Sequence, residues 1–309
     1  MQVAQEIEQS FAGLKLGSPQ VHLNLAFFPL IDEGNELPDY LLLDDALERN
    51  LARVTEVSAD GRVPELAFEN DSTDRILLVD GDELVGAKQN RVLNLSVLVG
   101  SRQKIVIPVS CVEQGRWSYH SRDFRSARRS LFAKARAKKM RQVTESLRVN
   151  QDRRSNQSQV WADVADKAAF YRVDSDTLAM ADVYEESAPR LSGYAAAFRA
   201  EAGQRGAVIA VDGKPIGIEL FDSAAAFARY LHKLVPSYAL DAIETETGKA
   251  VAPSAADVRR FLEAMQAAAT ERFPALGEGE DIRLTGDGVS GGALAANGRI
   301  VHLAGFAMA

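Results

Sequence analysis

Hydrophobic and polar positions alternate between residues 76 and 117, and the polar clusters fall where strands of a sheet should end. The first predicted strand has one wholly aliphatic face, at positions 93, 95, 97 and 99. The second has an apolar face at positions 105, 107, 109 and 111. Gly100-Ser101-Arg102 between them predicts a short hairpin connection. The pattern therefore predicts two antiparallel strands that face a core.

The segments before residue 76 predict further strands with one short helix. Residues 21–31 alternate as a half-buried strand does, and Pro38-Asp39 predicts a helix from Tyr40 to about Asn50. Residues 51–58 and 63–70 flank Asp60-Gly61, a strong signal for a hairpin turn. We therefore expect an antiparallel β-sandwich or barrel-like unit over about residues 18–120.

The hydrophobic period changes after Trp117. Residues 122–148 contain no Gly or Pro, and their narrow apolar stripe predicts a helix whose remaining face is mostly basic. Residues 149–158 are polar and predict a loop, and residues 159–171 have helical spacing. Ser187-Ala188-Pro189 predicts the start of another helix. Residues 121–203 therefore form a predicted helical middle.

The last third of the chain contains an internal repeat. Residues 206–221 align without gaps on residues 291–306, and Asp212-Gly213 falls on Asn297-Gly298. Both dipeptides favour two-residue turns, so each copy predicts a hairpin. Two predicted helices, Ser223 to about Asp241 and Ser254 to Phe273, separate the copies. We expect a hairpin-helix-helix-hairpin unit over residues 204–309 with one shared sheet, and an α+β fold for the whole chain.

Composition narrows the class of protein. The 309 residues are 46% hydrophobic and contain no apolar run near 18 residues, so the sequence predicts a globular protein that does not span a membrane. The start lacks the pattern of a secretory signal, and the chain has one cysteine. These features predict a cytoplasmic location, where thiols stay reduced.

Charge is distributed unevenly along the chain. The net charge is −7, yet residues 122–154 hold 12 Lys/Arg and 3 Asp/Glu. This basic segment could be a solvated face, a surface for RNA or phosphate, or a strut against the acidic remainder. Its only aromatic residues are Phe124 and Phe132, so base stacking along it is poorly supported. We favour a strut or a protein-partner surface, with RNA as the second interpretation.

Strand parity places Arg91 and Glu113 on the core-facing side of neighbouring strands, opposite or diagonal to each other. One interpretation is a structural ion pair, which need not stabilise the fold. The other is a catalytic or binding pocket, where Glu113 would be a base or ribose acceptor and Arg91 would bind phosphate. We favour the pocket because further polar residues surround the pair and form the candidate ligand-binding set: Lys88, Gln89, Asn90, Asn94, Gln114, Arg116 and Trp117.

Other chemistry is less strongly indicated. Asp80, Asp82 and Glu83 are weak candidates for metal ligands, but Asp80-Gly81 more simply predicts a turn with solvated acids. Cys111 is best interpreted as a small buried hydrophobic residue. The four His residues lack ligand spacing, so we expect no metal site. No GxGxxG or Walker loop is present, so the sequence indicates no particular cofactor.

Three motifs resemble an uncharacterised bacterial domain family named for its association with ADP-ribosylglycohydrolases and rhodanese-like phosphatases. They are DGDELVGAKQNRVLNLSVLV (80–99), IPVSCVEQGRW (107–117) and RSNQSQVW (154–161), and the resemblance covers roughly residues 20–245. By this association, the resemblance implies ADP-ribose, an NAD-derived nucleotide or a modified RNA end as ligand. Our hypothesis is a cytosolic protein that binds or processes a nucleotide-like, phosphate-bearing ligand. The alternative is a non-enzymatic scaffold that engages RNA or protein through residues 122–154.

Overall fold

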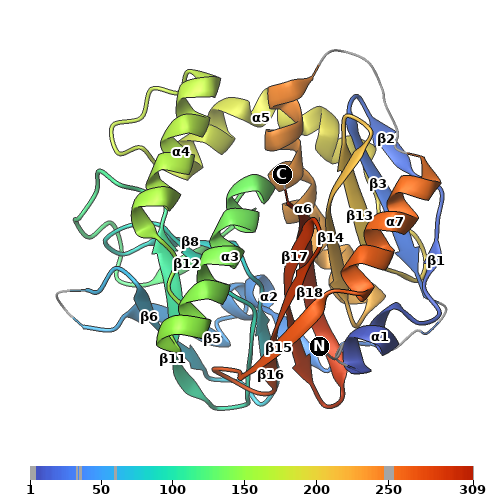
Figure 1. Ribbon diagram of the computed structural model, residues 1–309. Coiled ribbons are helices and arrows are strands. Elements are labelled where there is room, and N and C mark those ends of the chain that lie inside the picture. Colours follow the sequence, from blue (N-terminus) through green and yellow to red (C-terminus); the bar gives the residue numbers. More distant parts are fainter. Residues whose placement is uncertain (1–4, 33, 35–36, 59–60, 247–253, 309) are drawn as a thin grey trace. The chain divides into compact units, whose positions relative to one another are not determined.

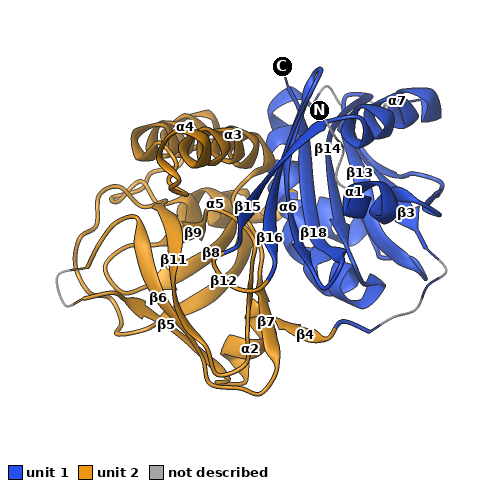
Figure 2. Cartoon of the chain, turned by 60° about the horizontal axis from the view of Figure 1, so that its bottom comes forward, with its two compact units in different colours: residues 1–38, 191–275, 279–309 blue, residues 39–190, 276–278 orange. Residues whose placement is uncertain are grey.

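The computed structural model describes residues 5–32, 34, 37–58, 61–246 and 254–308 (Figure 1). The chain forms two compact units, coloured separately in Figure 2. Unit 1 comprises Met1–Pro38, Leu191–Ala275 and Gly279–Ala309, and unit 2 comprises Asp39–Arg190 and Leu276–Glu278. This grouping differs from the boundaries expected at residues 120 and 203, because β3 (Leu25–Ile31) pairs with β13 (Gln204–Val211). No helix in the described ranges is long and apolar enough to cross a membrane.

Unit 2 is built around a six-stranded antiparallel sheet in the order β12-β8-β9-β11-β6-β5. The outermost strands, β12 and β5, are also neighbours, so the sheet curls into a barrel-like form. Its apolar side chains fill the interior, as the sequence predicts. The strands are β5 (Ala52–Glu56), β6 (Glu65–Asn70), β8 (Asp82–Gly86), β9 (Arg91–Leu93), β11 (Lys104–Cys111) and β12 (Phe124–Ser130).

The hairpin expected between residues 51–58 and 63–70 is present as β5 paired with β6. Asp60 of its predicted turn lies outside the described residues.

A second sheet of three strands replaces two of the predicted elements. It has the order β10-β7-β4, where β10 is Val97–Val99, β7 is Arg75–Leu78 and β4 is Tyr40–Leu42. The helix predicted from Tyr40 is therefore shorter, because β4 pairs in parallel with β7 before α2 (Leu43–Glu48) begins. The single strand predicted over residues 89–99 is also wrong, because β9 and β10 belong to different sheets.

Side chains at residues 94–96 stabilise the bend that separates β9 from β10. Asn94 Nδ2 donates to the carbonyl of Arg153 at 3.0 Å. Ser96 Oγ accepts a hydrogen bond from the backbone N–H of Asp80 at 2.9 Å. Leu95 is buried within the bend, so the apolar alternation continues across it and conceals the change of direction. The hairpin through Gly100 does not form, because β11 pairs with β9 and β10 pairs with β7.

The helices of the middle segment are α3 (Ala133–Asn150), α4 (Gln157–Tyr171) and α5 (Met180–Ala197). The helix predicted from residue 122 begins eleven residues later, because Phe124–Ser130 pairs with β8 as strand β12. The absence of Gly and Pro permitted a helix there, but pairing with β8 supplies the backbone hydrogen bonds instead. The start predicted at Ser187 is also wrong, because Pro189 lies inside α5.

Unit 1 contains a nine-stranded antiparallel sheet with the order β1-β3-β13-β14-β18-β17-β16-β15, to which β2 adds by pairing with β3. The two repeated hairpins are present as β13–β14 and β17–β18, and β14 pairs with β18 to join them in one sheet. Their turns have positive φ at Asp212, Gly213, Asn297 and Gly298, as expected for these dipeptides. The remaining strands are β1 (Lys15–Leu16), β2 (Gln20–His22), β14 (Lys214–Phe221), β15 (Ala269–Pro274), β16 (Glu280–Gly286), β17 (Val289–Ala296) and β18 (Arg299–Ala307).

Helices cover both faces of this sheet. Tyr238 of α6 (Ala224–Thr245) packs edge-on against Phe27 on one face. On the other face, α7 (Ala255–Gln266) and α1 (Gln5–Phe11) contribute to an apolar cluster with Phe28. The helix predicted to reach Phe273 ends at Gln266, because β15 follows it. The strand predicted over residues 21–31 is instead the hairpin β2–β3, which turns at Leu23 with φ +50°. The predicted α+β class is confirmed.

Candidate functional site

The register of unit 2 places the predicted pair near one end of the barrel. Arg91 of β9 lies opposite Cys111 of β11 and Leu84 of β8. Glu113 follows two residues after Cys111, so it is diagonal to Arg91, as parity predicts. The two side chains nevertheless form their ion pairs with other residues, Arg91 with Glu56 and Glu113 with Arg116. Of the two interpretations, the structural ion pair between Arg91 and Glu113 is therefore wrong, and the pocket at these residues stays a prediction.

Arg91 is buried completely, and its guanidinium has few partners. Nη1 donates to Gln89 Oε1 at 3.2 Å, and Nη2 lies 4.0 Å from Glu56 Oε1. Nε and Nη2 have no hydrogen-bond partner among the residues that the structure describes. Burial lowers the pKa of Arg91, while the acidic groups of Cys111 and Glu56 oppose that shift.

Glu113 has a complete set of hydrogen bonds. Its Oε1 accepts from Arg116 Nε at 2.8 Å and from Thr177 Oγ1 at 3.1 Å. Its Oε2 accepts from Arg116 Nη2 at 2.7 Å and from the Asn90 backbone N–H at 2.9 Å. Burial would raise the pKa of Glu113, but these hydrogen bonds outweigh burial and hold the pKa below its ordinary value.

Arg116 and Gln89 connect two loops at the barrel end. Arg116 Nη1 donates to the carbonyl of Ala87 at 2.7 Å and to that of Ser118 at 3.0 Å. Gln89 Nε2 donates to the carbonyl of Glu113 at 2.9 Å. The hydrogen bonds of Glu113 and Arg116 therefore hold the loop at 86–90 against the loop at 114–118.

Lys88 and two aromatic side chains lie on these loops. Lys88 Nζ is 5.3 Å from the ring centroid of Trp117 and 5.0 Å from that of Tyr119, within the range of cation–π contact. Trp117 is 48% exposed and Tyr119 is 54% exposed. Gln114 is also exposed, on the same loop. Exposed aromatic rings beside a cation are suited to a flat ligand that carries negative charge.

A pocket of about 690 Å³ opens beside Tyr119. Its lining residues come from the end of β5 and from the loop before β12: Thr55, Glu56, Ser58, Tyr119, His120, Ser121 and Arg122. Neither Arg91 nor Glu113 is among them. Lys88 is adjacent, because a Cβ built on Gly61 would lie 3.2 Å from both Lys88 Cδ and Glu56 Oε2.

None of the seven residues that line this pocket was predicted as a site residue, and Glu56 is the one that strand spacing could have revealed. Its side chain is only 4% exposed, and neither carboxylate oxygen has a hydrogen-bond partner within the described part of the chain. The available signal was strand parity, because Ala52, Val54 and Glu56 share one face of β5. A carboxylate on the same strand face as two core-facing apolar residues is expected to point inward, as Glu56 does.

The remaining predicted site residues lie elsewhere or have structural partners. Asn94 accepts from Ser110 Oγ at 2.6 Å and belongs to the bend described above. Cys111 is buried, its Sγ donates to Gln89 Oε1 at 3.0 Å, and burial raises its pKa.

The acids Asp80, Asp82 and Glu83 are buried, which contradicts the expectation of solvated side chains. Asp80 pairs with Arg136 and Lys139. Glu83 Oε2 accepts from Arg129 Nε at 3.0 Å, and burial raises the pKa of Glu83. The described residues contain no group of three His, Cys, Asp or Glu side chains arranged to hold a metal ion.

The basic segment faces inward more than its composition suggests. Arg136 and Lys139 of α3 are fully buried beneath Asp80, and Lys138 pairs with Asp163. These cations of the basic segment therefore lie inside unit 2, and the choice between a strut and a partner surface stays a prediction. The RSNQSQVW motif has a local role too, because Gln157 exchanges two 2.8 Å hydrogen bonds with the backbone of Cys111.

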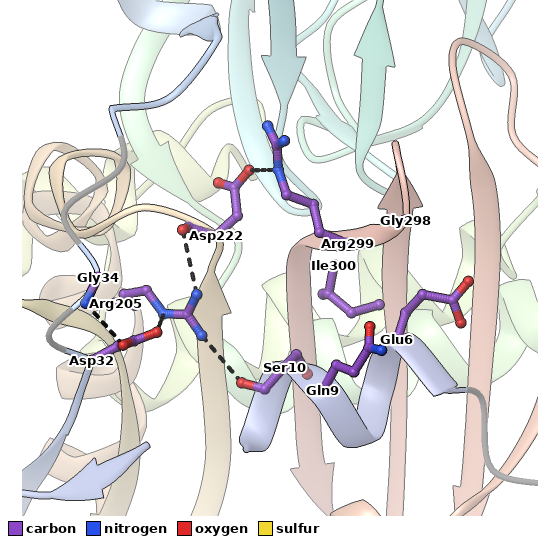
Figure 3. A pocket seen from close by; sticks show the side chains of 10 residues that line it. All are labelled: Glu6, Gln9, Ser10, Asp32, Gly34, Arg205, Asp222, Gly298, Arg299 and Ile300. Carbon is purple, nitrogen blue, oxygen red and sulfur yellow. Dashed lines mark hydrogen bonds and ion pairs between the residues drawn. The ribbon is translucent and has the colours of Figure 1, made fainter. Parts of the chain in front are cut away.

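Unit 1 has a pocket of its own, of about 290 Å³ (Figure 3). Arg205 Nη2 donates to the carbonyl of Ser10 at 3.2 Å, and its Nε lies 3.3 Å from Asp32 Oδ2. Arg299 Nε donates to Asp222 Oδ2 at 2.9 Å. The figure shows that both guanidinium groups are directed at groups of the chain itself. This pocket is therefore less suited to an anionic ligand than the pocket of unit 2.

The comparisons with known proteins agree with the motifs at the barrel end. Residues 13–306 match the family model described as the ARG and Rhodanese-Phosphatase-superfamily-associated Protein domain. No curated protein and no solved structure matches the chain. The family match spans both units and extends beyond the segment in which the resemblance is visible in the motifs. The chain therefore belongs to the ARG and Rhodanese-Phosphatase-superfamily-associated Protein domain family.

Proposed function

We propose that unit 2 binds a nucleotide-like, phosphate-bearing ligand in the pocket at the barrel end. The observation that carries this proposal is the pocket's lining: a buried carboxylate that has no hydrogen-bond partner among the described residues lies beside exposed aromatic and basic side chains. The family's name links it to ADP-ribosylglycohydrolases, which favours ADP-ribose or an NAD-derived nucleotide within this class. The proposal concerns binding and assigns no reaction.

The residues in and beside the pocket offer three kinds of chemistry, and each suits a different part of such a ligand. Arg122 supplies a planar cation suited to phosphate, and His120 lies beside it in the chain. Tyr119 and the neighbouring Trp117 offer ring faces for a base. Glu56 supplies an acceptor for hydroxyl or amino donors. A volume of about 690 Å³ is within the ordinary range for small-molecule sites.

Arg91 takes a different role from the one the sequence suggested. Arg91 is fully buried and does not line the pocket. We therefore propose that its positive charge compensates the negative charge of Glu56. Glu113 likewise holds the loop that carries Arg116 and Trp117 against the loop at 86–90, and is a positioning residue.

A thermal-shift panel tests the proposal. ADP-ribose, NAD, AMP and inorganic pyrophosphate are each added to the full chain. A ligand at one hundred times its Kd stabilises the folded state by about 2.7 kcal/mol, so the melting temperature should rise by several degrees. Arg122→Gln should weaken binding about tenfold, because a charge-assisted hydrogen bond is lost.

Arg125→Gln is the matched control for this panel. Arg125 is an exposed arginine of the same segment that does not line the pocket, so its variant should keep the shift. A flat panel, together with no heat on calorimetric titration of ADP-ribose, contradicts the proposal. If both variants lose the same affinity for the ligand, the effect comes from the overall positive charge and not from a contact with Arg122.

A further inference from the structure

We propose that Glu56 accepts hydrogen bonds from the neighbouring hydroxyl groups of a ribose, so that the pocket selects ribonucleotides over deoxyribonucleotides. This inference rests on the proposed function and adds the class of sugar that the ligand carries. The basis is the Glu56 carboxylate, which is buried but lies at the pocket wall.

The fold holds Glu56 in place rather than leaving it mobile at the surface. Glu56 is the last residue of β5 and pairs with Leu66, which is fully buried. Its side chain is 4% exposed, yet it forms part of the pocket wall. The sheet therefore fixes Glu56 at the pocket wall, with both carboxylate oxygens covered in the ligand-free chain, and a ligand reaches them by displacing that cover.

The residues that the structure describes leave the hydrogen-bonding capacity of the Glu56 carboxylate unused. An ionised carboxylate can accept several hydrogen bonds, and both oxygens here have no such partner in the ranges described. A buried polar group without partners costs about 1–3 kcal/mol, so this arrangement persists only if something offsets it. Arg91 at 4.0 Å compensates the charge, but that distance is too long for a hydrogen bond.

The missing partners are hydrogen-bond donors, and the geometry points to two of them side by side. A carboxylate presents two parallel acceptors, and two neighbouring sugar hydroxyls present two donors at a matching spacing. A metal ion fits less well, because Arg91 already places a positive charge beside the single carboxylate. The basic Arg122 in the same pocket then takes the phosphate attached to that sugar.

Calorimetric titration of AMP, 2′-deoxy-AMP and 3′-deoxy-AMP tests this assignment. The wild-type chain should bind AMP about tenfold more tightly than either deoxy compound, because hydrogen bonds to a charged group are lost. In Glu56→Gln the affinity for AMP should fall to that for the deoxy compounds, which should change little. Glu69→Gln, an exposed glutamate on the neighbouring strand β6, should keep the wild-type ratio.

Glu56→Asp provides a second variant in case Glu56→Gln fails to fold. It keeps the charge beside Arg91 but withdraws the oxygens, so the preference for AMP should fall at least severalfold. Equal binding of all three nucleotides by the wild type, still weakened by Arg122→Gln, overturns this inference and leaves the proposed function standing. An unchanged preference in Glu56→Asp or Glu56→Gln also overturns it. No binding of AMP or ADP-ribose by the wild type overturns both.

Discussion

At the scale of single residues, two buried glutamates of unit 2 show how partners decide the state of a carboxylate. Glu113 has four hydrogen bonds that favour its ionised form, and its pKa lies below the ordinary value. Glu83 has one arginine partner and an Oε1 with no hydrogen bond from the described residues, and burial raises the pKa of Glu83. Glu113 and Glu83 should therefore contribute to the free energy of unfolding with opposite dependence on pH.

Glu113→Gln and Glu83→Gln test this contrast. The lowered pKa of Glu113 gives stability that is present above the unfolded pKa and is lost as pH falls through the folded pKa. Glu113→Gln should thus lower the free energy of unfolding by about 1–3 kcal/mol at pH 7, with a smaller loss in acid. The raised pKa of Glu83 gives stability that is present below the unfolded pKa and is lost as pH rises.

Relative to wild type, Glu83→Gln should therefore become more favourable as pH rises from 4 to 8. Urea unfolding at several pH values measures both trends. Parallel pH profiles for the two variants would show that these partners do not control the two carboxylates. Glu69→Gln, which changes an exposed carboxylate, is the control for both variants.

The residue scale also shows where the sequence was informative about the site. Parity placed Arg91 and Glu113 on the correct faces, because side-chain direction in a strand depends only on local spacing. It could not show that Arg116 rather than Arg91 binds Glu113, since Arg116 lies in an irregular loop whose path has no period. Glu56 was missed, although the same parity argument applied to its strand.

At the scale of elements, α3 (Ala133–Asn150) is a basic helix whose inner face carries charge into the protein. Lys139 and Arg136 are both fully buried at Asp80, and Lys139 Nζ also donates to the carbonyl of Leu93 at 2.7 Å. Burial of ions is tolerated when they are paired and hydrogen-bonded. The helix is thus attached to β9 by a hydrogen bond and to the turn before β8 by an ion pair.

Lys139→Met should remove part of this attachment and lower the free energy of unfolding by about 3–5 kcal/mol, because Asp80 loses a buried partner. Arg141→Met is the matched control, since Arg141 is an exposed cation on the same helix. Its effect should stay within about 0.5 kcal/mol. Chemical denaturation of both variants provides the comparison, and similar effects would show that Lys139 is not a structural cation.

Helices, strands and turns could be predicted where local sequence determines them. They could not be predicted where pairing with a distant strand determines them. Asp212-Gly213 and Asn297-Gly298 adopt positive φ whatever surrounds them, so both hairpins of unit 1 were found. Residues 124–130 carry no local signal against a helix, and they form a strand only because β8 offers partners. The bend at Asn94 was hidden because Leu95 preserves the apolar pattern.

At the scale of the whole molecule, the chain order does not follow the division into units. Unit 1 gathers its sheet from the two ends of the sequence, and the barrel of unit 2 comes from the segment between them. Each unit has its own apolar cluster and its own pocket, so a ligand for unit 2 should act on the barrel end without requiring residues of unit 1. The family match at residues 13–306 includes parts of both units.

Hydrogen–deuterium exchange of the full chain, with and without saturating ADP-ribose, tests the location of the proposed site most directly. Ligand in the barrel-end pocket should slow exchange in peptides that cover residues 55–58 and 114–123, which line or flank it. Peptides that cover residues 5–32 and 204–222 of unit 1 should exchange as in the free protein. Protection confined to those unit 1 peptides, or no protection anywhere at saturation, would contradict the assignment of the nucleotide-like ligand to unit 2.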